Sequence, residues 1–345
     1  MKIVFAAKDG FDYNRVKVLR AGLESLGNIE TILFKISDRN KIVGLQLKEL
    51  SKDAAAVYVP PFRHRDLGFV RKYSSAPVVF DPLISRFLTK VIDYKHYHKA
   101  PQKWLIDYRD FRNCDLLIAD TEEHLSYFKR TFFLPKRLPT LVLPVGVNTE
   151  AFHGAVQKSM GATTPFKIGF YGSFVPLQGT LKIIQCAALL SQMGVPAEFE
   201  IIGSGYQYQE ALDLAQKLKL NTISFRGWLK YEDLAEAINS YDLCLGIFGD
   251  SLKADSVVPN KIFHYAAMSK PILTKDSPSM RRYFKDEENI FLCSTQPLEM
   301  AEKIQFLMSH PENLSAVAKN ARQLMEDKFS HKVLAQRFIN AISAL

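Results

Sequence analysis

Residues 245–274 read LGIFGDSLKADSVVPNKIFHYAAMSKPILT and contain the end of an apolar strand, a polar loop, a helix and a second strand. The loop carries Lys253, and the helix predicted over Asn260–Ala267 begins next to Pro259, a residue type favoured at the start of a helix. The second strand is predicted over Pro271–Thr274. Short apolar strands that alternate with helices are typical of a parallel sheet covered on both faces, so this segment predicts an α/β fold.

The same alternation extends outward over the whole chain in two blocks. In the first block, strands are predicted over Lys2–Ala6, Glu30–Phe34, Ala55–Val59, Pro77–Phe80, Leu116–Ala119 and Leu141–Leu143. In the second block, they are predicted over Lys167–Tyr171, Phe199–Ile202, Ile223–Phe225, Leu243–Ile247 and Pro271–Thr274, and the chain is predicted to be helical from about Leu298. We therefore predict two Rossmann-like, doubly wound domains that face each other across a cleft, with ligands outside the carboxyl ends of the strands.

The length and composition of the chain agree with two domains. A chain of 345 residues exceeds the usual size of a single core, and the small, polar segment 153–165 (HGAVQKSMGATTP) is the best candidate for a linker. We expect an N-terminal domain over 1–155 and a C-terminal domain over 165–333. The four cysteines form no CxxC pair, and we expect buried free thiols.

The net charge of +9 is concentrated in the first half, with +8 over residues 1–150 and +1 over residues 151–345. Basic and aromatic residues interleave over residues 86–112, where His96 is one candidate for a base or for an acceptor contact. Such a patch attracts phosphates on an anionic membrane, a phosphorylated acceptor or nucleic acid, or it is simply a solvated face. No nucleic-acid motif accompanies it, so we expect no nucleic-acid partner.

Membrane spans and export signals are not predicted. No apolar run approaches ~18 residues, and the first apolar stretch stops at Lys8. The cytoplasm is the expected location, with peripheral contact at the inner face of the membrane through residues 86–112 as an option.

Glycine-rich turns follow several strands of the second half. They are Gly172-Ser173 with Gln178-Gly179, Gly203-Ser204-Gly205, and Gly227-Trp228. Glycine lets a phosphate approach the backbone, and a helix N-terminus offers free N–H groups, although a glycine can also simply make a turn. Phe248 closes a further strand, and Gly10 follows the first strand of the chain on what we take as the acceptor side.

Lys261 lies in the first turn of the predicted helix Asn260–Ala267, where the helix dipole does not favour a cation. A bound anion such as a diphosphate would offset this cost, whereas an exposed surface lysine is the alternative. The sequence contains no Asp-x-Asp pair and no set of residues at metal-ligand spacing, so we expect neither a metal nor a cofactor. It also contains neither a complete P-loop nor a G-x-S-x-G motif, which leaves an ATPase or a common hydrolase unsupported.

The second half resembles the retaining GT-B glycosyltransferases of family 4. The resemblance rests on FYGSFVPLQGTLKIIQCAALL, FEIIGSG, ISFRGWLKYEDLAEAINSYDLCLGIFGDSLKAD and VVPNKIFHYAAMSKPIL, and more loosely on VVFDPLIS, CDLLIADTEEHLSYF and LPVGVNTEAF in the first half. The resemblance covers nearly the whole chain, and the segment that contains Pro259-Asn260-Lys261 is fairly specific for this family. It implies transfer of a sugar from a nucleotide sugar to a glycan, a lipid-linked or a small-molecule acceptor, as in the synthesis of bacterial cell-surface glycans.

The resemblance also implies roles for individual residues. The nucleobase of the donor would contact Gly227 and Trp228, and its ribose would contact position 264. We also place Gly203, Gly205 and Phe248 on the donor side. The residues that would contact the donor phosphates are Gly172, Ser173, Gln178, Gly179, Lys253, Asn260 and Lys261. Asp81 and Asp120 would face the acceptor, and we count Asp81, Lys253 and Lys261 as catalytic. The last helix, 334–345, would pack back on the first domain.

Two departures from the family pattern keep another function open. The family carries two glutamates eight positions apart, and here Ser256 and His264 occupy those places; its usual Arg and Lys after the first strand are replaced by Ser173 and Gln178. A carboxylate at 264 would accept two ribose hydroxyl hydrogen bonds, whereas a neutral histidine accepts one. The alternatives are therefore a catalytically silent relative that binds nucleotide or supports a partner transferase, and an epimerase or hydrolase of the same fold.

Overall fold

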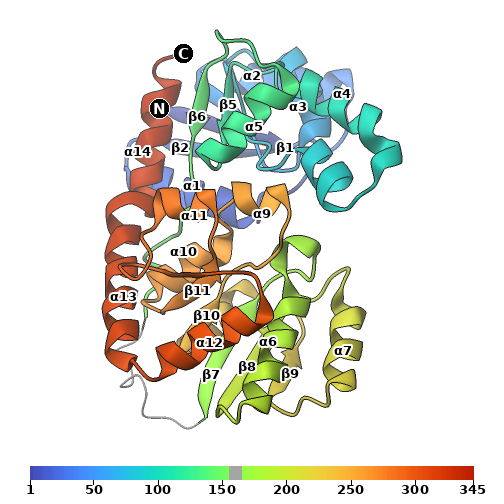
Figure 1. Ribbon diagram of the computed structural model, residues 1–345. Helices are drawn as coiled ribbons and strands as arrows, with labels where there is room; N and C mark the ends of the chain where they lie inside the picture. Colours follow the sequence, from blue (N-terminus) through green and yellow to red (C-terminus); the bar gives the residue numbers. More distant parts are fainter. Residues whose placement is uncertain (155–164) are drawn as a thin grey trace. The chain divides into compact units, whose positions relative to one another are not determined.

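The computed structural model describes residues 1–154 and 165–345, and the chain divides into two compact units (Figure 1). Unit 1 consists of Met1–Asn148 with Lys328–Leu345, and unit 2 consists of Thr149–Asp327. The chain changes units earlier than residue 155, because Val147 pairs with Ser330 in unit 1 whereas Phe152 stacks on a ring of unit 2. The linker predicted at 153–165 lies almost wholly outside the described residues.

Unit 1 contains six parallel strands in the order β2-β1-β3-β4-β5-β6. The strands are β1 (Lys2–Ala7), β2 (Glu30–Lys35), β3 (Ala54–Val59), β4 (Val78–Phe80), β5 (Leu116–Ala119) and β6 (Thr140–Val142). The helices are α1 (Asn14–Ser25), α2 (Lys41–Leu50), α3 (His64–Tyr73), α4 (Ala100–Asp110), α5 (Glu122–Phe132) and α14 (His331–Ile342). The order reverses between β1 and β3, which makes this the switch point of the sheet.

Both faces of the first sheet are buried, as its apolar strands predict. Along β1, Ile3 and Phe5 pack on one face with α1 and α14, while Val4 and Ala6 pack on the other. Gly22 of α1 permits the close contact with α14, since a Cβ at this position would stand 2.0 Å from the carbonyl oxygen of His331. Helix α14 begins at His331, three residues before the start expected from the sequence.

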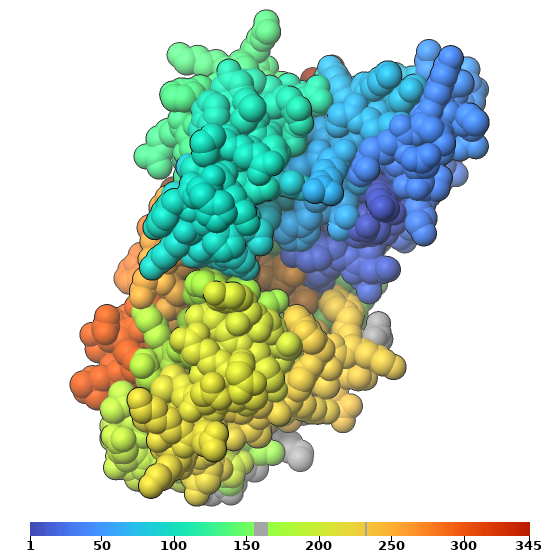
Figure 2. Space-filling model, turned by 90° about the vertical axis from the view of Figure 1, so that its right-hand side faces the viewer, coloured from blue at the N-terminus to red at the C-terminus, as the bar shows by residue number. Residues whose placement is uncertain are grey.

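A long connection joins β4 to β5 in unit 1. It contains the helical turns η1 (Leu88–Asp93) and η2 (Tyr97–Lys99) and then α4. Figure 2 shows this turquoise segment, around residue 100, at the surface of the molecule. The basic and aromatic residues noted in the sequence therefore lie on one crossover at the carboxyl edge of β4.

Unit 2 also contains six parallel strands, in the order β12-β11-β10-β7-β8-β9. The strands are β7 (Phe166–Tyr171), β8 (Ala197–Ile202), β9 (Ile223–Arg226), β10 (Leu243–Leu245), β11 (Ile272–Lys275) and β12 (Phe291–Cys293). The helices and helical turns are η3 (Pro176–Gln178), α6 (Thr180–Gln192), α7 (Tyr208–Lys217), η4 (Tyr231–Asp233), α8 (Leu234–Asn239), α9 (Leu252–Ser256), α10 (Asn260–Ala267), α11 (Pro278–Tyr283), α12 (Pro297–Met308), α13 (Pro311–Leu324) and η5 (Met325–Phe329). The chain reverses direction between β7 and β10, so the switch point of this sheet lies between these strands.

The structure confirms the predicted fold class of two doubly wound parallel sheets. Two local expectations were wrong or incomplete. Lys253 lies on α9 rather than on a loop, because the Ser251 side chain accepts a hydrogen bond from the Ala254 N–H and caps this short helix. Strand β12 was not predicted from the sequence.

None of the helices in the described ranges combines the length and the apolar character that a bilayer span requires. The four cysteines are free thiols, and burial raises the pKa of the Cys114 and Cys293 thiols to about 12.

Candidate functional site

The switch point of unit 2 brings together three segments that are far apart in the sequence. The turn after β7 supplies Gly172 and Gln178, the turn after β10 supplies Gly246, and the first turn of α10 supplies Lys261. Open α/β sheets bind ligands outside the carboxyl ends of their strands at this place. Lys261 contacts residues of both turns.

The Lys261 ammonium lies among neutral groups. It donates a hydrogen bond of 2.6 Å to Oε1 of Gln178 and lies 3.4 Å from the carbonyl oxygen of Gly246. It also lies 3.4 Å from the centroid of the Phe170 ring. A Cβ on Gly172 would stand 3.0 Å from Nζ, so the glycine makes room for the ammonium.

No carboxylate of the described residues forms an ion pair with Lys261, although its side chain is buried. Burial lowers the pKa of Lys261 well below its usual value, and no opposite charge counters that effect. A buried charge without a counter-ion is costly, and the cost disappears when an anion binds beside it. The switch point thus holds a buried lysine whose charged form a bound anion would stabilise.

Two helices start at this site without a side-chain cap. Helix α10 follows Pro259, and α6 follows Gly179, which has a φ of +67°. The hydroxyl of Thr180, in the first turn of α6, is buried and has no hydrogen-bond partner among the described residues. Uncapped first turns and a spare hydroxyl are groups that a phosphate can bind. Sequence reasoning missed Thr180, and its place directly after the Gln178-Gly179 turn was the available signal.

Three of the predicted phosphate-site glycines have a packing reason to be glycine. A Cβ on Gly179 would stand 2.5 Å from the backbone of Phe248, one on Gly203 2.0 Å from the oxygen of Gly172, and one on Gly205 2.7 Å from the nitrogen of Phe174. These contacts hold the turns after β7, β8 and β10 against one another. The glycines therefore shape the edge of the sheet whether or not a phosphate contacts them.

His264 of α10 lies in a closed aromatic environment. Its ring stacks on Phe152 with centroids 4.0 Å apart, faces the edge of Tyr231 at 5.8 Å, and its Nδ1 lies 2.6 Å from the hydroxyl of Tyr171. Burial lowers the pKa of His264 to about 3, so the ring is neutral near pH 7. In this position the side chain packs α10 against the sheet. The ribose contact inferred for position 264 stays a prediction.

We expect His264→Phe to change the pH dependence of stability. The pKa of His264 is about 3 in the folded state and near 6.5 in the unfolded state. Because the unfolded state takes up a proton that the folded state does not, His264 lowers the unfolding free energy as the pH falls below about 6.5. Relative to the phenylalanine variant, the wild type should lose about 2 kcal/mol of unfolding free energy between pH 7 and pH 5. Urea unfolding of both proteins at the two pH values measures this, and a difference that does not vary with pH would contradict it.

The remaining donor-side residues are spread around the same edge. Lys253 is largely buried on α9, which packs against η3, and Asn260 and Ser173 are half-buried in the first turn of α10 and in the turn after β7. Trp228 is 65% exposed after Gly227, whose environment has room for a side chain. Phe248 is different, because its side chain lies in the apolar core and only its backbone reaches the turn of Gln178.

Asp81 is fully buried at the end of β4 in unit 1. It forms an ion pair with Arg15 and accepts a hydrogen bond of 2.6 Å from the hydroxyl of Tyr58. Burial alone would lower the pKa of Arg15, but the attraction of Asp81 outweighs it and raises the pKa above its usual value. These contacts tie α1, β3 and the end of β4 together. The structure therefore gives Asp81 a structural role, and the catalytic role inferred from the resemblance stays a prediction.

We predict that Asp81→Ala reduces activity by destabilising unit 1. Removal of one partner of a buried ion pair should lower the free energy of unfolding by roughly 3–5 kcal/mol. The double variant Arg15→Met with Asp81→Leu should cost less than Asp81→Ala, because no buried charge remains unpaired. Chemical denaturation of the three proteins tests this; unchanged stability of an inactive Asp81→Ala variant would restore the catalytic interpretation.

The other acceptor-side candidates also have partners within unit 1. Asp120 lies 2.7 Å from Nδ1 of His124 at the start of α5, and Gly10, with a φ of +89°, packs against the guanidinium of Arg63. His96 lies between η1 and η2, where partial desolvation and then Lys99 lower its pKa.

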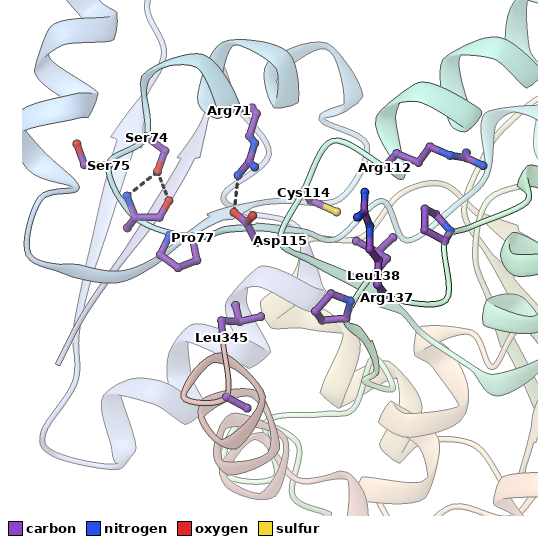
Figure 3. Close-up of a pocket in the computed structure, with 14 residues that line it drawn as sticks. Arg71, Ser74, Ser75, Pro77, Arg112, Cys114, Asp115, Arg137, Leu138 and Leu345 are labelled. Carbon is purple, nitrogen blue, oxygen red and sulfur yellow. Dashed lines mark hydrogen bonds and ion pairs between the residues drawn. The ribbon is translucent and has the colours of Figure 1, made fainter.

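A cavity of about 910 Å³ lies at the opposite edge of the first sheet, beside the amino ends of its strands (Figure 3). It is lined by residues just before β4, β5 and β6, among them Pro77, Asp115 and Pro139. Arg71 pairs with Asp115 there and neutralises its charge. Ligands of doubly wound sheets bind at the carboxyl ends, so we place no site in this cavity. Across the described residues, no group of His, Cys, Asp or Glu side chains is placed to hold a metal ion.

Comparison with known proteins shows which family and which solved structures the chain resembles. Residues 182–340 match the family model described as glycosyl transferase-like. The crystal structures of HepE from Anabaena, in complex with UDP and glucose or with UDP-glucose, are similar over 100% of both chains, with TM-scores of 0.77 at 15% and 16% identity. Sucrose-phosphate synthase from Thermosynechococcus elongatus has a TM-score of 0.77 at 12% identity over 100% of both chains.

A glycosyltransferase from Rickettsia africae is also similar, with a TM-score of 0.67 at 13% identity over 99% of this chain and 98% of that one. No curated protein sequence matches the chain. The C-terminal part of the chain thus matches a glycosyl transferase-like family, and the whole chain has the two-domain GT-B fold of these glycosyltransferases.

Proposed function

We propose that the chain is a nucleotide-sugar-dependent glycosyltransferase whose donor diphosphate binds at the switch point between β7 and β10. The observation that carries this proposal is the buried Lys261 ammonium, which has no carboxylate partner among the described residues. A diphosphate would supply that partner, and Gln178 and the first turns of α6 and α10 would supply neutral hydrogen bonds. The UDP and UDP-glucose complexes of HepE, which has the same fold, support this choice of ligand.

The charges at the site fit the departure of a diphosphate. As the bond between the sugar and the diphosphate breaks, negative charge grows on the leaving oxygen. Lys261, Lys253 and the amides of the two helix starts stabilise this charge, and such preorganised groups act strongly where water is excluded. Lysines and amides serve the purpose without a metal ion, so we propose a metal-independent reaction.

We further propose that the sugar is transferred with retention of its anomeric configuration. The leaving diphosphate takes the proton of the acceptor hydroxyl, which attacks from the same face, so no strong protein base is needed. This agrees with the ion-paired state of Asp81. The proposed acceptor is a glycan, a lipid-linked molecule or a small molecule, and the proposed role is in the synthesis of cell-surface glycans.

Nucleotide binding and turnover test the proposal. Thermal shift of the full chain against UDP, GDP, ADP, dTDP and CMP without metal should reveal one nucleotide that raises the melting temperature. Release of that nucleotide from its sugar conjugate should then depend on an acceptor. Binding without turnover would favour the silent relative, and a free or isomerised sugar without an acceptor product would favour a hydrolase or epimerase.

Replacement of Lys261 by methionine should have opposite effects on stability and on binding. Removal of an uncompensated buried ammonium should raise the stability of the ligand-free protein, by at least about 1 kcal/mol. This corresponds to a melting temperature higher by roughly 2–4 °C for a domain of this size. Affinity for the nucleotide diphosphate should fall on the order of 10–100-fold, the value of a hydrogen bond to a charged group.

Lys270→Met provides the matched control. Lys270 is also buried, but its ammonium donates to the carbonyl oxygens of Asn239 and Tyr241, at 2.8 and 3.0 Å, beside the amino end of β11. We expect this variant to keep its nucleotide affinity, because Lys270 lies just before the amino end of β11 and not at the switch point. Equal loss of affinity in both variants would remove the special role of Lys261.

A further inference from the structure

Unit 1 contains a small cavity at the carboxyl edge of β4 that carries an excess of positive charge. The cavity measures about 210 Å³, and three of its lining side chains are the cations of Arg86, Lys90 and Lys103. They come from the loop after β4, from η1 and from α4, all on the crossover between β4 and β5. One water needs only ~10–15 Å³, so the cavity has room for a polyatomic anion.

More cations surround those that line the cavity. Desolvation lowers the pKa of Lys103, and the repulsion of Arg86, Lys99 and Arg65 lowers it further. In the part of the chain that the structure describes, none of these four residues forms an ion pair. Positive groups that repel one another without a counter-ion favour the binding of an anion between them.

The nearby carboxylates do not neutralise this charge. Asp107 and Asp110 attract Arg86, but neither forms an ion pair with it. Asp107 is fully buried, and burial raises its pKa to about 6 despite its hydrogen bonds with the Phe87 N–H and the Ser85 hydroxyl. Asp107 is still mostly ionised at neutral pH, but the two carboxylates face five cations, so an excess of positive charge remains around the cavity.

Neutral groups complete the site. The Thr89 hydroxyl lines the cavity, is buried and has no hydrogen-bond partner among the described residues. His64, also in the wall, is buried with an Nε2 that lies 3.7 Å from Asp107, beyond hydrogen-bond distance. Burial lowers its pKa to about 3, so the ring is neutral and can donate one N–H to an anion.

We propose that this cavity binds a phosphate or diphosphate group of the acceptor. The planar Arg86 guanidinium suits two oxygens of one phosphate, and the two lysines add point charges. Three lining cations match the charge of a phosphate monoester or diphosphate better than that of a single carboxylate. The cavity is formed by residues of unit 1 alone and does not depend on the proposed function. The assignment of the phosphate to the acceptor rests on the proposed function.

Binding of inorganic pyrophosphate to the full chain tests this cavity. The Lys261→Met background removes the donor-site lysine, so that the titration reports on the other unit. We expect the Lys261→Met protein to bind pyrophosphate. Adding Arg86→Gln and Lys103→Gln to this protein should weaken the binding on the order of tenfold or more. A control with Lys129→Gln and Arg130→Gln, two exposed cations of α5, removes the same charge and should bind as before.

Absence of pyrophosphate binding in the Lys261→Met background, or equal weakening in the control, would overturn the proposal. The same two changes made with Lys261 retained provide a folding check, because this protein should have an intact donor site and bind nucleotide as the wild type does. Nucleotide binding by the wild type is a separate result, so failure of the proposed function is distinguishable from failure of this cavity.

Vesicles distinguish the source of the phosphate. If the phosphate belongs to a lipid, the wild type should bind to vesicles of phosphatidylcholine with phosphatidylglycerol. The Arg86→Gln, Lys103→Gln variant should then fail to bind to the same vesicles. Pyrophosphate binding without vesicle binding would indicate a water-soluble phosphorylated acceptor. Vesicle binding that both double variants lose equally would reflect general surface charge and would contradict a built site.

Discussion

The proposed donor site depends on a buried lysine that has no carboxylate partner among the described residues. Lys261 is held by Gln178, by the Gly246 carbonyl and by the face of Phe170, all of them neutral groups. Such an arrangement costs stability in the ligand-free protein, and a folded protein can retain it only if the rest of the sheet edge is rigid. The expected compensation is the binding of an anion, which turns a cost in stability into affinity.

The rigidity of this edge comes from turns that pack backbone against backbone. Gly179, Gly203 and Gly205 each allow a neighbouring main chain to approach where a Cβ would clash. The aromatic environment of His264 fixes α10, so that Lys261, one turn earlier on this helix, keeps its place at the switch point. The site is therefore positioned by contacts that bind no ligand themselves, as preorganised sites require.

The sequence predicted the parts of this account that depend on local patterns. Short apolar runs marked most strands, and a lysine in the first turn of a helix marked Lys261, because both signals need only neighbouring residues. The partners of Lys261 could not be predicted in the same way, since Gln178 lies 83 residues away along the chain. Helix α9 was missed for another reason, because five residues show no helical period.

Asp81 illustrates what tertiary structure alone decides. Its place after a strand suggested a role at the acceptor, but the burial and the ion pair with Arg15, 66 residues earlier, are not visible in the sequence. The basic segment 86–112 was visible, whereas the contributions of His64 and Arg65 from α3 required the fold. The resemblance predicted the fold class correctly, and the residue roles that it implied remain proposals.

The proposed binding of a nucleotide diphosphate at the β7–β10 switch point is tested most directly by a crystal structure of the chain with UDP. A phosphate oxygen should lie within hydrogen-bond distance of the Lys261 ammonium, with the Thr180 hydroxyl or the first amides of α6 and α10 as further donors. A diphosphate bound elsewhere, with Lys261 still donating only to Gln178 and Gly246, would contradict it.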